Sequence, residues 1–194
     1  MNQKNVRILF NIYENSPDNN ARYLLGTQGY STLIWFGINP NIATNMISGN
    51  TTNKINSFTK YCGYDSFLLI NIYPERNSHA YNLNDFNVKY NETNQNAILQ
   101  KLNILSKNQN RNDIVAIWGD SIDDRDFLRN CLRDILFQIN LDNLNWFSLL
   151  YSKYENPLTA SGHPRHPAGI RGKFNNVVQL VPFYINQYIN SNLK

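Results

Sequence analysis

The chain of 194 residues contains little cysteine. Its two cysteines, Cys62 and Cys131, lie far apart and form no CxxC motif. Two isolated thiols cannot build a disulfide framework, a zinc knuckle or a four-cysteine iron–sulfur cluster. We therefore expect both to be buried, reduced thiols.

The chain also lacks a long apolar segment. No stretch approaches the roughly 20 apolar residues that a membrane span needs. The polar start, MNQKNVR, has no apolar core of the kind found in secretory signals. We therefore expect a cytoplasmic protein that does not contact a membrane.

Charge of one sign dominates only weakly. The 18 Lys and Arg residues outnumber the 14 Asp and Glu residues, so the formal net charge is +4. This charge fits a polyanionic partner, but many proteins with other functions are equally basic. Hydrophobic residues make up 42% of the chain, enough for a packed core, and neither a linker nor an internal repeat divides it. We predict a single domain over residues 1–194, and a monomer.

Four near-continuous apolar runs have the length of strands: 31–38, 65–73, 113–119 and 144–151. Such runs are typical of strands that are buried on both faces of a parallel sheet. Apolar residues at helix spacing lie between the runs, at 55–62, 97–105 and 127–137. This alternation predicts an α/β fold with a central, mostly parallel four-stranded sheet. The segment 21–26 favours an edge strand, and 174–188 favours a closing helix bent or broken near Pro182.

Four short motifs follow these runs. They are GINPN at 37–41, LLIN at 68–71, AIWGD at 116–120 and, after a longer loop, GHPRHP at 162–167. In open α/β sheets, ligands bind beyond the carboxyl ends of the strands. The first three motifs are predicted at that edge, so the pattern indicates one site there.

The motifs resemble those of the uracil-DNA glycosylase superfamily, from about Gly37 to Gly172. In that superfamily the first strand ends in a turn whose carboxylate or amide positions the attacking water. The resemblance implies that Asn39 is catalytic and that Gly37, Ile38 and Pro40 contact the substrate. An asparagine before proline is also common in ordinary turns.

Two more strand ends match the same superfamily. The second strand of its members ends in an asparagine that hydrogen-bonds the extruded base, and Asn71 holds this position. The third strand ends in Trp-Gly, as Trp118 and Gly119 do. The resemblance therefore implies that Asn71 and Trp118 contact the substrate, and it implies a three-layer αβα sandwich. Asn71 could equally cap the loop that follows its strand.

The segment HPAGIRG at 166–172 resembles the His-Pro loop of the superfamily, which stabilises the leaving base and wedges an apolar residue into the duplex. His166 then takes the place of the histidine, and Ile170 that of the wedge. Further residues are expected to contact the DNA: His163, Arg165, Arg171 and Lys173. Alternatively, the three cations only form a solvated basic face. The alternative for His163 is that it only shapes the loop.

RYLLG, GINP, the WG strand end and the PRHP loop together resemble a bacterial family to which no function has been assigned. The link between that family and the glycosylases is our inference. The chemistry explains the residues, because breaking a glycosidic bond develops positive charge on the sugar and negative charge on the base. His166 is the candidate donor to that base. Asn39 can orient water but cannot accept its proton.

One expected feature is missing. The superfamily usually has an aromatic residue after the GINP turn that stacks on the flipped base, yet residues 41–50 contain none. Tyr73 or Trp118 could provide a stacking face instead, although aromatic residues at strand ends more often belong to the core. The small residues after the turn would leave room for a bulky modified pyrimidine.

The function that we predict is a monofunctional DNA glycosylase that flips a modified pyrimidine out of duplex DNA and hydrolyses its N-glycosidic bond, leaving an abasic site. Glucosylated hydroxymethylcytosine of phage DNA, and hence antiviral defence, is the specific hypothesis. No cofactor and no metal are predicted, although His163 and His166 with Asp120, Asp123 or Asp124 suggest a metal hydrolase as an alternative. The same residues also allow a non-catalytic module that senses modified DNA, or a hydrolase of free nucleosides or nucleotides.

Overall fold

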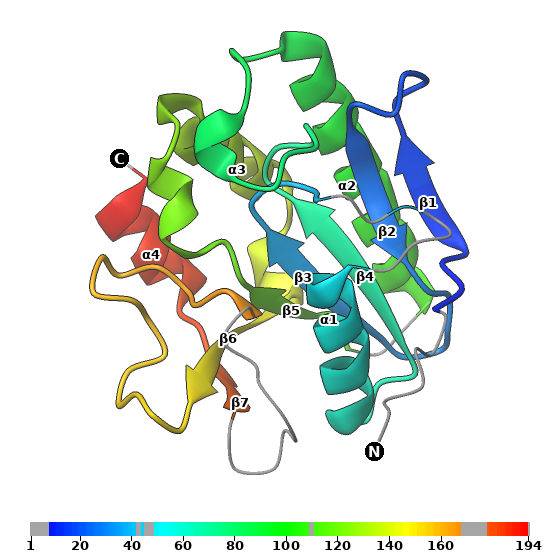
Figure 1. The fold of residues 1–194 in the computed structure, drawn as a ribbon. Helices are drawn as coiled ribbons and strands as arrows, with labels where there is room; N and C mark the ends of the chain where they lie inside the picture. Colours follow the sequence, from blue (N-terminus) through cyan, green and yellow to red (C-terminus); the bar gives the residue numbers. More distant parts are fainter. Residues whose placement is uncertain (1–7, 42–43, 45–48, 109–110, 168–177, 194) are drawn as a thin grey trace.

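The computed structural model describes residues 8–41, 44, 49–108, 111–167 and 178–193 (Figure 1). Within them the chain forms a seven-stranded sheet in the order β1-β2-β4-β3-β5-β6-β7. The strands are β1 (Ile12–Asn15), β2 (Arg22–Gly26), β3 (Thr32–Gly37), β4 (Ser66–Asn71), β5 (Asp113–Ala116), β6 (Asn145–Tyr151) and β7 (Val178–Pro182). The α/β class is confirmed.

The predicted number of strands is wrong. The four apolar runs form β3, β4, β5 and β6, which pair in parallel at the centre of the sheet. Three antiparallel strands extend this centre. On one side β2 pairs with β4 and β1 pairs with β2, and on the other side β7 pairs with β6. The added strands have weaker apolar patterns. β1 and β7 contain exposed or partly buried positions, and β2 is buried throughout but begins with Arg22. The segment 21–26 contains a strand, but β1 lies outside it, so it is not the edge.

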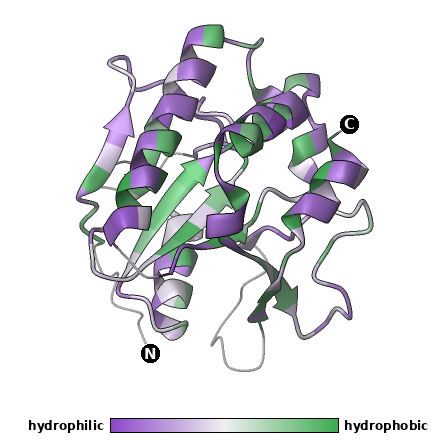
Figure 2. Cartoon of the chain, turned by 180° about the vertical axis from the view of Figure 1, so that it is seen from behind, coloured by the Kyte–Doolittle hydropathy of each residue, from purple (hydrophilic) through white to green (hydrophobic). Residues whose placement is uncertain are grey.

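Helices cover both faces of the sheet. The first, α1 (Asn50–Tyr61), lies on one face, and the other face carries α2 (Val88–Asn108), α3 (Asp126–Gln138) and α4 (Ile185–Asn192) (Figure 1). Short 3-10 helices, η1 (Ala80–Asn82), η2 (Gly119–Asp123) and η3 (Leu141–Asn143), lie in the connections. Figure 2 shows the apolar central strands between helices whose outer surfaces are largely hydrophilic. No described helix is long and apolar enough to cross a membrane.

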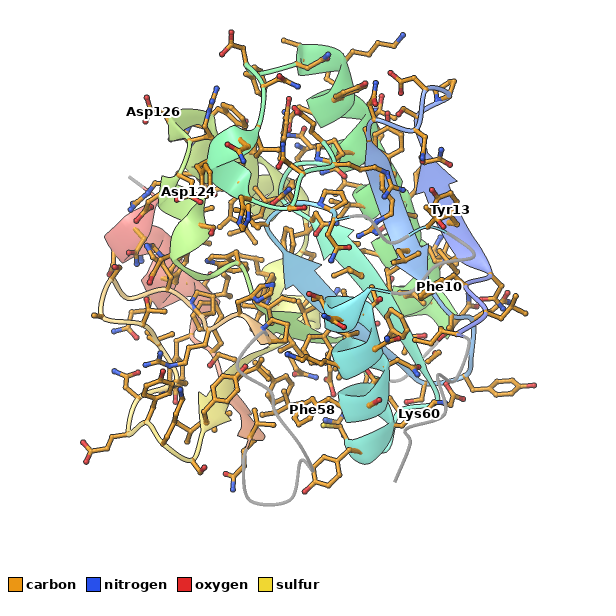
Figure 3. All side chains as sticks on the ribbon, in the orientation of Figure 1. Phe10, Tyr13, Phe58, Lys60, Asp124 and Asp126 are labelled. Atoms are coloured by element: carbon orange, nitrogen blue, oxygen red, sulfur yellow. The ribbon has the colours of Figure 1, made fainter. Side chains whose placement is uncertain are left out.

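Alternate residues of the central strands fill two separate cores. On β3, Leu33 and Trp35 pack with Phe58 of α1, whereas Ile34 and Phe36 face the core beneath the other three helices. The period of two that strand geometry imposes explains this division. Helix α1 shows the matching pattern, because Phe58 is buried while Lys60, also labelled in Figure 3, is exposed.

The predicted closing helix is wrong over its first part. Residues 178–182 form β7, which pairs antiparallel with β6, and helix α4 begins only at Ile185. Residues 174–177 lie outside the described part of the chain. Pro182 explains the change, because proline lacks the N–H of a helix interior but fits an edge strand.

Cys131 is buried, as expected, and Cys62 is partly buried. Both are free thiols, and burial raises the pKa of Cys62 to about 11 and that of Cys131 to about 12.

Candidate functional site

A pocket of about 300 Å³ lies at the carboxyl ends of β3, β4 and β5. Its volume suits a small ligand. Three of the motifs meet there because parallel strands end at the same edge of the sheet. The lining includes Gly37, Ile38 and Asn39 after β3, Asn71 of β4, Trp118 after β5, and His166. The start of α1 and the loop after β4 also contribute to the wall.

The loop after β4 fixes the amide of Asn39. Its Nδ2 donates to the carbonyl oxygens of Asn77 at 2.8 Å, Pro40 at 3.3 Å and Glu75 at 3.5 Å. Three acceptors around one atom identify it as the nitrogen of the amide. The oxygen Oδ1 accepts no hydrogen bond from the residues that the structure describes. Asn39 therefore presents an acceptor that could hold a water molecule.

Asn71 lies beside Gly37 in the pocket wall. The side chain is only 2% exposed, and its Nδ2 has no hydrogen-bond partner in the described structure. A Cβ on residue 37 would lie 3.0 Å from its Oδ1, so glycine leaves the amide its space. A buried donor without an acceptor is costly. A carbonyl oxygen of a ligand would supply the missing acceptor.

The backbone of the PRHP loop holds His166 in place. Tyr151 donates to the carbonyl oxygen of His166 at 2.9 Å, and the N–H of Gly119 donates to Pro164 at 2.9 Å. Gly119 has a φ of +64°, which favours glycine there. The protein around the imidazole, and then the positive charge of Lys54, lower the pKa of His166 below its usual range. The residue is nevertheless exposed to solvent, and the lowered pKa favours the neutral imidazole near pH 7.

Several pocket residues were missed by the sequence reasoning, among them Arg22, His79 and Tyr81. Arg22, at the start of β2, lines the pocket and is 1% exposed. His79 and Tyr81 also line it, and their rings stack with centroids 5.1 Å apart. One signal could have identified Arg22: it is a charged residue at the start of the apolar segment RYLLG, which forms a fully buried strand. Nothing in the sequence pattern marks His79 and Tyr81.

The structure does not bring Tyr73 to the pocket. This side chain is fully buried, its hydroxyl accepts from the N–H of Asn87 at 2.8 Å, and its ring packs against Phe127. The expected stacking face is therefore taken by the core. Trp118 lines the pocket but is 1% exposed, because its ring packs against Phe36 and other aromatic residues. Pro40 is buried behind the turn and is not among the lining residues.

The prediction that His163 contacts DNA disagrees with its burial. It is fully buried, with Nδ1 2.8 Å from the hydroxyl of Tyr188 and Nε2 3.1 Å from Asp123. These contacts join α4 to η2, and they favour the alternative interpretation that His163 shapes the loop. Arg165 is partly exposed outside the pocket, its guanidinium 3.6 Å from the centre of the Tyr154 ring. The predicted Ile170, Arg171 and Lys173 lie outside the described residues.

The structure gives no support to the metal alternative. Among the residues described, no three His, Cys, Asp or Glu side chains are grouped so that they could hold a metal ion. Asp123 instead binds His163 and Arg129. Asp126 lies in the first turn of α3 and projects outward in Figure 3, where a carboxylate stabilises the start of a helix.

Comparison with known proteins gives one match. A family described as "Protein of unknown function (DUF1643)" matches residues 22–168. This range begins at RYLLG and includes the GINP, WG and PRHP motifs. No curated protein and no solved structure matches the chain.

Proposed function

Because the chain belongs to the DUF1643 family, whose function is unknown, its reaction has to be inferred from its site, and we propose that it is a DNA glycosylase. In this proposal it flips a modified pyrimidine out of duplex DNA and hydrolyses the N-glycosidic bond, leaving an abasic site. The observation that carries the proposal is that Asn39, Asn71 and His166, from three separate motifs, line one pocket. Asn39 can orient the attacking water, Asn71 can hydrogen-bond the edge of the base, and His166 can stabilise the base as it departs.

Asn39 holds the attacking water. Its Nδ2 is occupied by carbonyl oxygens, so Oδ1 accepts a hydrogen bond from the water and directs the oxygen lone pair toward C1′ of the sugar. An amide does not take up the proton near neutral pH. The proton therefore passes to solvent after the new bond to C1′ has formed, and the departure of the base drives the step.

His166 and Asn71 act on the base. When the bond between C1′ and the base nitrogen breaks, the electron pair stays with the base and its negative charge spreads to a carbonyl oxygen. A neutral imidazole donates a hydrogen bond to that oxygen, and the lowered pKa of His166 keeps it neutral. Asn71 supplies a buried N–H that can donate a hydrogen bond to a carbonyl oxygen of the pyrimidine.

The substrate in this proposal is a hypermodified cytosine, such as the glucosylated hydroxymethylcytosine of phage DNA. Residues 41–50 offer no aromatic ring to close over the base. The stacked rings of His79 and Tyr81 lie on the wall formed by the loop after β4 instead. This arrangement favours a base that carries a substituent, and the biological role would be defence against phage.

Alkali-induced strand cleavage tests the proposal. Duplexes that carry uracil, mismatches or hypermodified cytosines are incubated with wild type, Asn39→Ala, His166→Ala and, as a matched control, Asn103→Ala, an exposed residue of α2. We expect breaks at hypermodified cytosine with wild type and the control, and at least 100-fold slower cleavage with the two site variants. DNA binding without breaks on any duplex would overturn the glycosylase proposal in favour of a sensing module.

A further inference from the structure

Arg22 is a buried cation in the wall of the candidate site. Strand β2 runs antiparallel to β4, so its first residue lies near the carboxyl end of β4 and Asn71. The N–H of Arg22 donates to the carbonyl oxygen of Pro74 at 2.8 Å, which holds it beside the loop after β4. The side chain is 1% exposed and lines the pocket.

The guanidinium keeps its charge at this position. Burial, and then repulsion from Arg76, lower the pKa of Arg22 to about 9, which still leaves it protonated near neutral pH. Arg76 is itself held in place, because it donates to Asn41 at 2.9 Å and to the Tyr13 hydroxyl at 2.7 Å. Arg76 does not line the pocket, but its positive charge acts on Arg22 from behind the wall. A guanidinium has N–H donors and no acceptor, so it selects ligand atoms that accept.

Other groups in the pocket have the same polarity. Asn71 offers a buried Nδ2 without a partner in the described chain. Thr51 and Thr52, in the first turn of α1, line the pocket, and this turn contains no acidic residue. The positive end of a helix dipole favours negative charge. Two carboxylates, those of Asp120 and Asp124, also line the pocket, but both residues are exposed and solvent screens them.

We propose that Arg22 is a further catalytic residue, which binds the acceptor edge of the base as the base departs with its negative charge. The inference rests on the proposed function. As the bond to C1′ breaks, the electron pair becomes charge on the base, and Arg22 and Asn71 donate hydrogen bonds to the atoms that carry this charge. The base takes a proton from solvent after release. The ligand that the empty site prefers is therefore an anionic pyrimidine.

Calorimetric titration with two free pyrimidines tests this inference without DNA. Barbiturate is anionic at neutral pH, whereas uracil is neutral and of similar size. We expect wild type to bind barbiturate at least 10-fold more tightly than uracil, Arg22→Lys to keep part of this preference, and Arg22→Gln to lose it. Arg133→Gln on α3, away from the pocket, is the matched control. Equal binding of the two ligands by wild type, or no binding of barbiturate, would overturn the proposal. Both outcomes are measured on wild type, so they do not depend on whether a variant folds.

The failure of this inference can be distinguished from that of the proposed function. If no DNA releases a base but barbiturate is preferred and the preference is lost in Arg22→Gln, the anion site stands and the glycosylase does not. If hypermodified DNA releases its base at an unchanged rate in folded Arg22→Gln, the glycosylase stands and Arg22 has no part in it. We expect this variant to lose 100-fold or more in rate.

Discussion

Asn39 donates a hydrogen bond of 2.8 Å from Nδ2 to the carbonyl oxygen of Asn77, and this bond ties the turn after β3 to the loop after β4. The same loop carries His79 and Tyr81 to the pocket wall. The residue that we expect to hold the water is thus fixed by a segment that also lines the pocket. A change at Asn39 should affect the stability of the site as well as its chemistry.

Asn39→Asp is expected to destabilise the protein. The substitution places a carboxylate oxygen where Nδ2 now meets three carbonyl oxygens, so hydrogen bonds are replaced by repulsion. A lost hydrogen bond costs about 1 kcal/mol and the repulsion adds to this cost, which together should lower Tm by about 3–6 °C. Differential scanning calorimetry measures this change, with Asn103→Asp on the surface of α2 as the control. An unchanged Tm would show that the three carbonyls do not hold the amide.

The imidazole of His166 is expected to stay neutral to lower pH than an ordinary histidine. Desolvation by the surrounding protein and the charge of Lys54 both disfavour the imidazolium. The folded protein therefore takes up this proton only well below pH 6.5, the ordinary midpoint of histidine. An NMR titration of the ring proton, assigned through His166→Ala, measures the midpoint. Lys54→Met should move it upward, and a midpoint at or above 6.5 in wild type would contradict the assignment of a neutral donor.

Arg165→Ala is expected to weaken DNA binding through the phosphate backbone. The guanidinium lies over the ring of Tyr154, which the ammonium of Lys153 also contacts, on a surface outside the pocket. Each phosphate contact contributes about 0.9 to the slope of log affinity against log salt concentration. We expect fluorescence anisotropy to show this slope reduced by about that amount, for modified and unmodified duplexes alike. Lys107→Ala, an exposed residue of α2, should leave the slope unchanged. An equal slope in wild type and Arg165→Ala would place the DNA elsewhere.

Much of the central fold could be predicted from the sequence. A strand that is buried on both faces must be apolar at nearly every position, so β3 to β6 were visible as runs. The strands at the two sides of the sheet have weaker patterns, and β1 was missed altogether. Pro182 was read as a break in a helix because the pairing of β7 with β6 depends on residues distant in the sequence.

The candidate site could be predicted only where topology decides it. The ends of parallel strands must meet, which brought Gly37, Asn71 and Trp118 together. Whether a side chain points into the pocket or into the core depends on tertiary packing. For this reason the sequence wrongly predicted that Tyr73 and His163 contact the substrate and the DNA, whereas both are buried. Arg22 was missed because β2 reaches the pocket by antiparallel pairing, which strand-end reasoning does not anticipate.

The buried network behind Trp118 predicts a large effect of Tyr188→Phe. The hydroxyl of Tyr188 accepts from Trp118 Nε1 at 3.0 Å and forms a second hydrogen bond, of 2.8 Å, with Nδ1 of His163. Removing the hydroxyl leaves two buried nitrogens without a partner, at about 1–3 kcal/mol each. We expect urea denaturation to show a loss of about 2–4 kcal/mol, against less than about 0.5 kcal/mol for Tyr184→Phe on the surface. If the two variants were equally stable, the network would not hold α4 against the pocket wall.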